Sequence, residues 1–307
     1  MSRLTRRRFL TISAGAAATS AGVFAGSRRA AAQPDITQWR GTALGARTTL
    51  TLAHADAGRI ADDVTRELAR LEDIFSLYKP DSALSRLNAD GHLAAPPFEL
   101  LECLSLCDRV HTLTGGLFDP TIQPLWSAWA RHYTNDTSGP DVAQAQALTG
   151  WQNVSFGSDT VRLDRTGMAL TLNGIAQGYI ADRIAAMLRA EGLTNVMVDT
   201  GELAAIGGHP AGGDWPVTLK SSGQAHLRDM ALATSAPRGT CFDAAGTAGH
   251  ILSPVTGQPA DTPWRQISIS GPSAAMADGL TTAACLMDRA AIRSAVNALK
   301  LRLVHLS

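Results

Sequence analysis

An aspartate and a threonine four residues apart are the most chemically suggestive pair in this sequence. Asp278 and Thr282 lie in residues 273–287, an Ala-, Leu- and Met-rich segment that predicts a helix with Ser273 as its N-cap. On a helix this spacing places both side chains on one face. A buried carboxylate needs a compensating partner, and carboxylate, hydroxyl and carbonyl oxygens suit a hard cation such as Mg²⁺. The spacing fits equally well an exposed aspartate with a threonine bonded back to the preceding turn.

A second stretch, residues 171–183, combines a turn with the start of a helix. The apolar run at residues 168–170 predicts a short buried strand before it, and helical periodicity from Tyr179 to Leu188 predicts a helix after it. Gly174 and Gly178 lie between them and leave backbone amides uncovered, which at a helix N-terminus favours an anion. The glycine spacing matches neither the dinucleotide-binding GxGxxG motif nor a P-loop, and an ordinary strand-to-helix turn of a packed core would look similar.

The elements that must position these two stretches alternate along the chain without an obvious linker. Helices are expected at residues 60–75, 98–112, 140–148, 179–188, 274–287 and 289–299. Further strands are expected at residues 47–52, 154–156, 161–163, 195–199, 217–219, 230–234, 267–269 and 301–304. Residues 76–91 are expected to form a loop with short ordered pieces. This order predicts an α+β fold with a mixed, mainly antiparallel sheet and flanking helices, not a regular Rossmann order.

The charge of the chain changes once its N-terminus is set aside. The 307 residues are 45% hydrophobic and carry 27 basic and 27 acidic side chains, so the formal charge is zero. Residues 1–32 contain six arginines and no acid, which leaves 21 basic against 27 acidic side chains in residues 33–307. A mildly acidic chain of this size has ample core for a folded enzyme and is a poor candidate for nucleic-acid binding.

The N-terminus has the pattern of a twin-arginine signal peptide. Residues 5–10 read TRRRFL, a weakly hydrophobic run follows, and residues 30–32 form an AAA site before Gln33. The competing interpretation, a disordered basic arm, does not explain the small-residue end. We therefore expect a signal peptide at residues 1–32, one folded domain at residues 33–307, and export to the periplasm. The apolar run is too short and mild for a membrane span, and none is expected in the mature chain.

Four cysteines complete the inventory of reactive side chains. Cys103 and Cys107 lie on the apolar stripe of the helix expected at residues 98–112, where they are predicted to be small core residues. Cys241 and Cys285 stand far apart in sequence. No CxxC or Cys/His metal spacing occurs, so the sequence does not predict a zinc or iron–sulfur site.

Eight short blocks occur in order over nearly all of the chain after residue 32. They are residues 44–48 (LGART), 75–88 (FSLYKPDSALSRLN), 114–121 (TGGLFDPT), 172–182 (LNGIAQGYIAD), 198–202 (VDTGE), 232–235 (LATS), 250–257 (HILSPVTG) and 277–282 (ADGLTT). Together they resemble the ApbE family of periplasmic FAD:protein FMN transferases. Within that family, the central block is most similar to the NosX-type accessory proteins of nitrous oxide respiration.

The resemblance implies a flavin site that joins the two stretches described first. FAD would bind in a cleft, with Mg²⁺ on its pyrophosphate. The implied metal ligands are the backbone carbonyl of Ala176 and the side chains of Asp278 and Thr282. The implied FAD contacts are Leu44, Tyr78, Leu117, Phe118, Asp119, Tyr179 and Ile251. Among these, Tyr78 is suited to stack on a flavin ring.

The reaction implied by the resemblance transfers FMN from FAD to a Thr or Ser hydroxyl of an acceptor protein and releases AMP. His250 falls on the family's candidate general base, and a near-neutral pKa suits imidazole to that role. The acceptor would be an exported or membrane electron-transfer protein, such as the NosR-like flavoprotein of nitrous oxide reduction. Two alternatives remain open: an FAD pyrophosphatase that uses water as acceptor, and a non-catalytic flavin-binding assembly protein.

Several positions depart from the family pattern. The departures are Leu44 for methionine, Asn173 for glycine, Gln177 for lysine, Ala236-Pro237 for glycine and Ser253 for aspartate. Losing the lysine removes a positive charge near the phosphates, which bears on the rate or on the pose of FAD. The Asp278–Thr282 pair and His250 are kept, so activity is expected.

Overall fold

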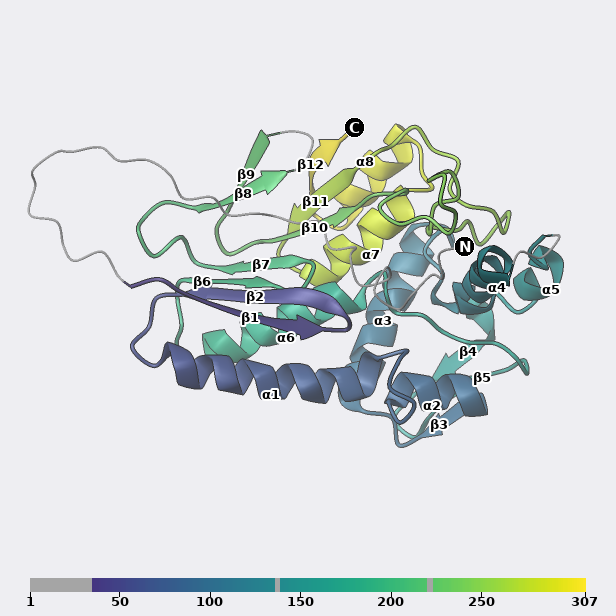
Figure 1. The fold of residues 1–307 in the computed structure, drawn as a ribbon, viewed down its shortest axis with the longest axis horizontal. Helices are drawn as coiled ribbons and strands as arrows, with labels where there is room; N and C mark the ends of the chain where they lie inside the picture. Colours follow the sequence, from purple (N-terminus) through teal and green to yellow (C-terminus); the bar gives the residue numbers. More distant parts are fainter. Residues whose placement is uncertain (1–34, 136–138, 220–222) are drawn as a thin grey trace, which may run out of the picture.

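The structure is a computed structural model that describes residues 35–135, 139–219 and 223–307 (Figure 1). The predicted signal peptide therefore lies outside the described residues. Among the helices in these ranges, none is long and apolar enough to cross a membrane.

A seven-stranded sheet forms the centre of the described chain. In spatial order its strands are β1 (Thr37–Ala43), β2 (Ala46–Leu52), β6 (Val196–Asp199), β7 (Leu203–Ile206), β10 (Ala231–Ser235), β11 (Ile267–Gly271) and β12 (Arg302–Leu306). Each neighbouring pair is antiparallel. Helices cover the sheet, so the predicted α+β class with a mainly antiparallel sheet is confirmed (Figure 1).

The two faces of the sheet are buried differently. One face packs against helices α1 (Ala57–Phe75), α6 (Ala176–Ala190), α7 (Ala274–Ala284) and α8 (Arg289–Ala298), with α3 (Phe98–Leu113) against α1 and α7. Because side chains alternate along a strand, Val196 and Val198 join this core, whereas Met197 joins a second cluster. The hairpin β8 (Trp215–Leu219) and β9 (Gly223–Leu227) packs on that second face, and its buried side chains join those of β7 and β10 in the second cluster.

The remaining elements form a smaller layer beside the helices. They are α2 (Ala83–Asp90), β3 (His92–Ala94), the 3-10 turns Pro120–Ile122 and Trp151–Asn153, α4 (Gln123–Asn135), α5 (Val142–Gln146), β4 (Val154–Phe156) and β5 (Thr160–Leu163). Strands β3, β5 and β4 make a small antiparallel sheet. Figure 1 shows this layer on the side of the molecule away from the β8–β9 hairpin.

Most expected elements are present, but the sequence missed β1, β3, β7, β9, α2 and α4. One prediction was wrong: Met168 and Leu170 are buried and Ala169 is half-buried, yet residues 168–170 pair with no strand. The side-chain amide of Asn88 occupies the place of a partner strand. Its Nδ2 donates to the Leu170 carbonyl (2.8 Å), and its Oδ1 accepts from the Leu170 amide (2.7 Å). A single side chain thereby satisfies both backbone groups of a buried residue.

Candidate active site

Helix α7 meets the first turn of α6 and the turn just before it through the residues that the sequence singled out. The amide of Gly178 donates to Asp278 Oδ2 at 3.1 Å. The hydroxyl of Thr282 donates to the Gly174 carbonyl at 3.3 Å. Asp278 and Thr282 thus contact the chain on either side of Ala176. One face of α7 is therefore fixed against residues 174–178, called here the glycine turn.

The two glycines are needed because the backbones approach so closely. A Cβ on Gly178 would lie 2.4 Å from the carbonyl oxygen of Ala274, which is backbone and cannot move aside cheaply. A Cβ on Gly174 would lie 2.9 Å from Thr282 Oγ1. Neither glycine has a positive φ, so close packing and not backbone conformation selects glycine here.

We expect Gly178→Ala to destabilise the protein by about 1–3 kcal/mol, because α6 and α7 must separate to admit the methyl group. The matched control is Gly58→Ala in α1, where a Cβ would meet nothing within 4 Å. That change should be neutral or stabilising by up to about 1 kcal/mol. Denaturant unfolding of both variants measures the difference. Equal stability of the two variants would contradict the close contact.

Asp278 is a buried carboxyl group without a basic partner among the described residues. Its side chain is 4% exposed, and the Gly178 amide is the donor that reaches its carboxylate. Burial raises the pKa of Asp278 to about 7, and the nearby carboxylate of Asp182 adds to the rise. At this position the charged form of Asp278 is stabilised only if a cation binds next to it.

Asp182, which is half-buried, and Glu202, which is buried, are acids near this site to which the sequence gave no role. Asp182 in α6 caps α7, accepting from the amides of Ala274 (2.8 Å) and Ala275 (3.0 Å) and from the Ser273 hydroxyl (2.8 Å). Glu202 accepts from the Thr234 amide at 2.9 Å, and burial, followed by repulsion from Asp278, raises its pKa well above the usual range. A charged residue inside an otherwise apolar block was the available signal, since a buried charge requires partners.

The imidazole of His250 is held in one tautomer by the chain around it. Its Nδ1 lies 3.1 Å from the carbonyl of Thr240, so Nδ1 carries the proton and Nε2 presents a lone pair. The backbone amide of His250 donates to the same carbonyl at 3.0 Å. Burial lowers the pKa of His250, which keeps the ring neutral and able to accept a proton at neutral pH.

Two predicted FAD contacts, Leu44 and Tyr78, lie in segments that meet at Glu72. The Leu44 amide donates to Glu72 Oε1 at 2.7 Å, and Lys79 Nζ lies 3.4 Å from Glu72 Oε2. Leu44 has a φ of 47° and Gly45 a φ of 77°, which form the tight turn between β1 and β2. The Tyr78 side chain is 65% exposed, so its ring is open to a ligand.

The segment with Leu117, Phe118 and Asp119 is fixed by side chains at the C-terminal end of α3, His111 in its last turn and Thr114 just after it. The Phe118 amide donates to Thr114 Oγ1 (3.1 Å), and its carbonyl lies 2.8 Å from His111 Nδ1. Asp119 accepts from the amide and hydroxyl of Thr121. The segment also touches the glycine turn, since the Thr171 amide donates to the Pro120 carbonyl at 2.8 Å.

Tyr179 is placed in the interior and not on an open surface. It is 2% exposed, its ring packs edge-on against Phe75 at 5.3 Å, and its hydroxyl donates to Glu102. Its amide donates to the Ile175 carbonyl. These contacts are structural, and the flavin contact expected of Tyr179 stays a prediction. Ile251, next to His250, is partly buried against the main core.

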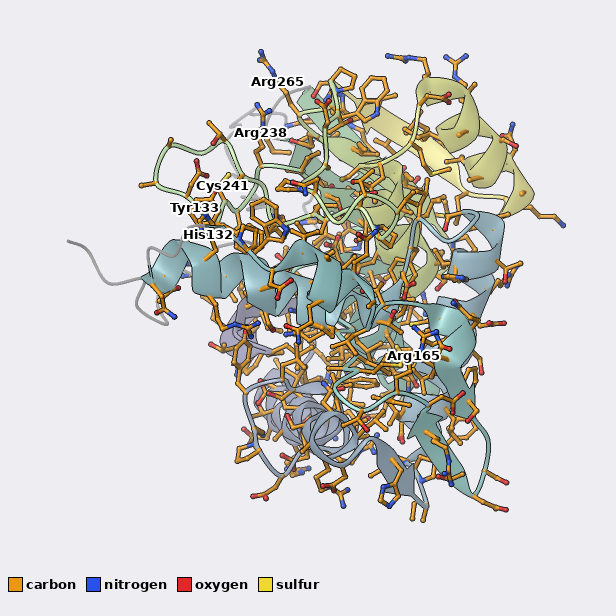
Figure 2. All side chains as sticks on the ribbon, turned by 90° about the vertical axis from the view of Figure 1, so that its right-hand side faces the viewer. His132, Tyr133, Arg165, Arg238, Cys241 and Arg265 are labelled. Atoms are coloured by element: carbon orange, nitrogen blue, oxygen red, sulfur yellow. The ribbon has the colours of Figure 1, made fainter. Side chains whose placement is uncertain are left out.

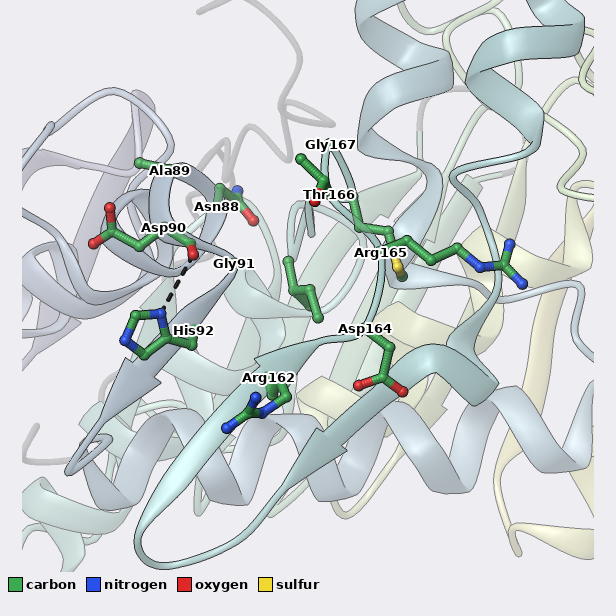
Figure 3. Close-up of a pocket in the computed structure, with 12 residues that line it drawn as sticks. Asn88, Ala89, Asp90, Gly91, His92, Arg162, Asp164, Arg165, Thr166 and Gly167 are labelled. Atoms are coloured by element: carbon green, nitrogen blue, oxygen red, sulfur yellow. Dashed lines mark hydrogen bonds between the residues drawn. The ribbon is translucent and has the colours of Figure 1, made fainter.

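A separate cavity of about 380 Å³ opens between the end of α2 and the strand β5 (Figure 3). Polar and charged side chains line much of it, among them Asn88, Arg162 and Asp164. Its lining contains none of the side chains predicted to contact FAD or a metal. The cavity is therefore distinct from the site around Asp278.

The fold and this arrangement define the class of protein. The ApbE family pattern matches residues 44–304, and the chain belongs to the ApbE family. The resemblance drawn from the sequence is thereby confirmed.

Curated relatives in this family carry one name. The chain is 29% identical over 250 residues to the FAD:protein FMN transferase of Chlamydia pneumoniae, covering 78% of this chain and 79% of that one. It is 30% identical over 259 residues to the protein of the same name from Treponema pallidum, covering 75% and 71% of the two chains.

Solved structures agree with the fold. The flavinyl transferase ApbE of Pseudomonas stutzeri, in its apo form, aligns with a TM-score of 0.75 at 26% identity, covering 88% of this chain and 91% of that one. The apbe protein of Thermotoga maritima aligns with a TM-score of 0.77 at 25% identity, covering 89% and 94% of the two chains.

Proposed function

We propose that this chain is a Mg²⁺-dependent FAD:protein FMN transferase. The observation that carries the proposal is the pairing of Asp278 and Thr282 with the glycine turn around Ala176, in a chain that belongs to the ApbE family. FAD is the donor substrate, a Thr or Ser hydroxyl of another protein is the acceptor, and AMP is the product.

The residues present fit a hard cation. Burial raises the pKa of the Asp278 carboxyl to about 7, so its charged form lacks a compensating positive charge. Within the described ranges, no group of three or more His, Cys, Asp and Glu side chains is arranged to hold a metal. The donors would be the Asp278 carboxylate, the Thr282 hydroxyl and the Ala176 carbonyl. Mg²⁺ accepts one carboxylate together with neutral and phosphate oxygens, so this set suits it.

When bound, Mg²⁺ supplies charge that stabilises the pyrophosphate as the P–O bond breaks. The protein residues do the rest. Gly174 and Gly178, which have no side chains, would let backbone groups at the start of α6 approach the phosphates. The exposed ring of Tyr78 offers a flat apolar surface to the flavin. The segments at Glu72 and Phe118 keep the flanking contacts in place.

His250 is suited to accept the proton of the acceptor hydroxyl at Nε2. The hydroxyl oxygen forms a bond to the phosphorus of the FMN half of FAD. The bond from that phosphorus to the bridging oxygen breaks, and AMP leaves with this oxygen. Because the Thr240 carbonyl engages Nδ1, the lone pair for this step is on Nε2.

Two departures from the family pattern are compatible with activity. Ser253 Oγ accepts from the Thr256 amide at 3.2 Å, a turn-stabilising bond that an aspartate also makes. The Gln177 side chain packs against Gly201, and the backbone carbonyl of Gln177 accepts from Thr200 Oγ1 at 2.9 Å. The glutamine therefore keeps a packed position and lacks only the charge of a lysine.

Incubating the protein with FAD, Mg²⁺ and a candidate acceptor tests the proposal. Flavin fluorescence on the acceptor after denaturing electrophoresis supports transfer. Free FMN and AMP without labelling would instead identify a pyrophosphatase. Stable FAD binding with no turnover would identify a non-catalytic flavin-binding protein.

We expect Mg²⁺ together with FAD to raise the melting temperature more at pH 8 than at pH 6. The folded-state pKa of Asp278, about 7, lies above the ordinary value of 3.8. The metal-free protein therefore loses stability as pH rises from about 4 to about 7, and the carboxylate that binds the cation forms as pH rises through 7. Melts with Mg²⁺ or chelator at both pH values measure this. An equal shift at both would contradict the assignment of Asp278.

We further propose that the protein works in the periplasm after twin-arginine export of residues 1–32. The pattern of those residues supports export, and the likeness of residues 172–182 to NosX-type proteins supports a NosR-like flavoprotein as acceptor. A reporter fused to residues 1–32 should reach the periplasm. Export should fail when Arg6 and Arg7 are replaced by lysine, and a reporter that is still exported would overturn this proposal.

A further inference from the structure

The segment that carries His250 contains no helix or strand of its own. Residues 236–266 connect β10 to β11 with two isolated bridges, Cys241 with Gly249 and Leu252 with Pro259. An irregular segment of this length does not hold a side chain in one position by itself, because its backbone has many accessible conformations. Its order must come from contacts with other elements.

Aromatic side chains of α4 supply one set of these contacts. Phe242 lies against Trp126 (ring centroids 5.4 Å apart), Trp129 (6.3 Å) and Tyr133 (6.4 Å). The rings of Trp129 and Tyr133 are within 24° and 5° of parallel to Phe242. Figure 2 shows Cys241, the neighbour of Phe242, beside His132 and Tyr133 of α4. These rings form a cluster that is separate from the main core.

Hydrogen bonds attach a second part of the segment, at Val255 and Gly257, to α4 and α5. The indole Nε1 of Trp129, a residue that is 8% exposed, donates to the Gly257 carbonyl at 2.9 Å. Gln146 in α5 donates to the Val255 carbonyl at 2.6 Å. Gly257 has a φ of 70°, and a Cβ there would lie 2.5 Å from Val142 Cγ1. The segment is therefore pressed onto α4 and α5.

In the sequence, His250 lies between Phe242 and Gly257, the two residues through which Trp129 contacts the segment. On one side, the Phe242 amide donates to the Ala248 carbonyl at 2.8 Å, and the Thr240 carbonyl accepts from His250. On the other side, the Ala260 amide donates to the Ile251 carbonyl at 2.8 Å. Trp129 contacts both sides, Phe242 through its ring and Gly257 through its Nε1.

We propose that Trp129, acting with Phe242, is the positioning residue that holds His250 in place for proton transfer. The inference rests on the role of His250 in the proposed function and assigns to α4 a part in catalysis through the His250 segment. Small displacements of a catalytic group reduce rates steeply, by up to about a hundredfold for 1 Å.

Trp129→Phe removes the indole donor while keeping an aromatic ring. We expect kcat for FMN transfer to fall by about ten- to a hundredfold, with the Kd for FAD within about threefold of wild type. The matched control is Trp264→Phe, because Trp264 Nε1 donates to the Met287 carbonyl at 2.8 Å, the same kind of bond made outside the stretch from Phe242 to Gly257 that contains His250. That variant should keep kcat within about twofold.

A double-mutant cycle separates positioning from a general loss of structure. If Trp129 acts through His250, adding Trp129→Phe to His250→Ala should slow transfer by less than about twofold. If the rate reductions of the two single variants instead multiply in the double variant, the proposal is overturned. Phe242→Leu, which keeps apolar volume without the ring stacking, should behave like Trp129→Phe and provides a second test if the first variant folds poorly.

NMR titration of His250 gives a readout that does not depend on activity. Burial lowers the pKa of His250, so loosening the segment should raise this pKa toward its ordinary value of 6.5 in Trp129→Phe but not in Trp264→Phe. An unchanged pKa together with an unchanged kcat would overturn the positioning role. If the pKa shifts but His250→Ala transfers FMN at the wild-type rate, the base assignment fails, and with it the catalytic part of this inference.

Discussion

Asp278→Asn is expected to lower Mg²⁺-dependent FMN transfer by about a thousandfold or more. The amide keeps the shape of the side chain and can still accept from the Gly178 amide, but it removes the only charged donor in the proposed cation site. Charge stabilisation by a metal is worth several kcal/mol in the transition state, and each 1.4 kcal/mol corresponds to a tenfold change in rate. Transfer rates over a Mg²⁺ titration measure the effect.

The same substitution, although it lowers activity, is expected to raise the stability of the metal-free protein. Because the pKa of Asp278 is raised to about 7, the metal-free wild type holds a buried charge at pH 8. Asp278→Asn removes that charge and should melt at a higher temperature than metal-free wild type at this pH. The matched control is Asp288→Asn, which alters the N-cap of α8 and should leave transfer unchanged. An Asp278→Asn protein with full activity would refute the assigned role.

His250→Ala should reduce kcat by about 10²–10⁴-fold while leaving the Kd for FAD within a few-fold of wild type. The expected range is that of a lost general base, and the side chain is assigned to the proton and not to binding. Single-turnover transfer and fluorescence titration of FAD separate the two quantities. His226→Ala, on the exposed face of β9, serves as control and should behave as wild type.

The pH profile of the wild type follows from the same assignment. The base must be neutral, and burial lowers the pKa of His250 below its ordinary 6.5. With saturating Mg²⁺, transfer should therefore be flat from pH 7 to 8 and fall as pH drops below that lowered pKa. A limb that rises only above pH 7 would point to a different base.

Local patterns singled out the two stretches of the candidate site separately. Asp278 and Thr282 share one helix, and the glycine turn is continuous in sequence, so spacing alone placed each on its own element. The meeting of the two stretches, 100 residues apart at Gly178 and Asp278, came from the family resemblance. Helix periodicity does not specify which helices pack together.

The parts that the sequence missed depend on long-range side-chain contacts. Asn88 pairs with Leu170 across 82 residues and replaces the strand that the apolar run predicted. Asp182 caps α7, whose first residue, Ala274, lies 92 residues later. Trp129 bonds to Gly257 across 128 residues. Local periodicity and residue propensity do not specify which distant residue a side chain contacts.

Crystals soaked with FAD and Mn²⁺, a substitute for Mg²⁺ with measurable anomalous scattering, test the central claim most directly. An anomalous peak is expected within about 2.0–2.3 Å of the Asp278 carboxylate, the Thr282 hydroxyl and the Ala176 carbonyl, next to the FAD pyrophosphate. A peak at a different set of residues, with FAD bound, would contradict the account.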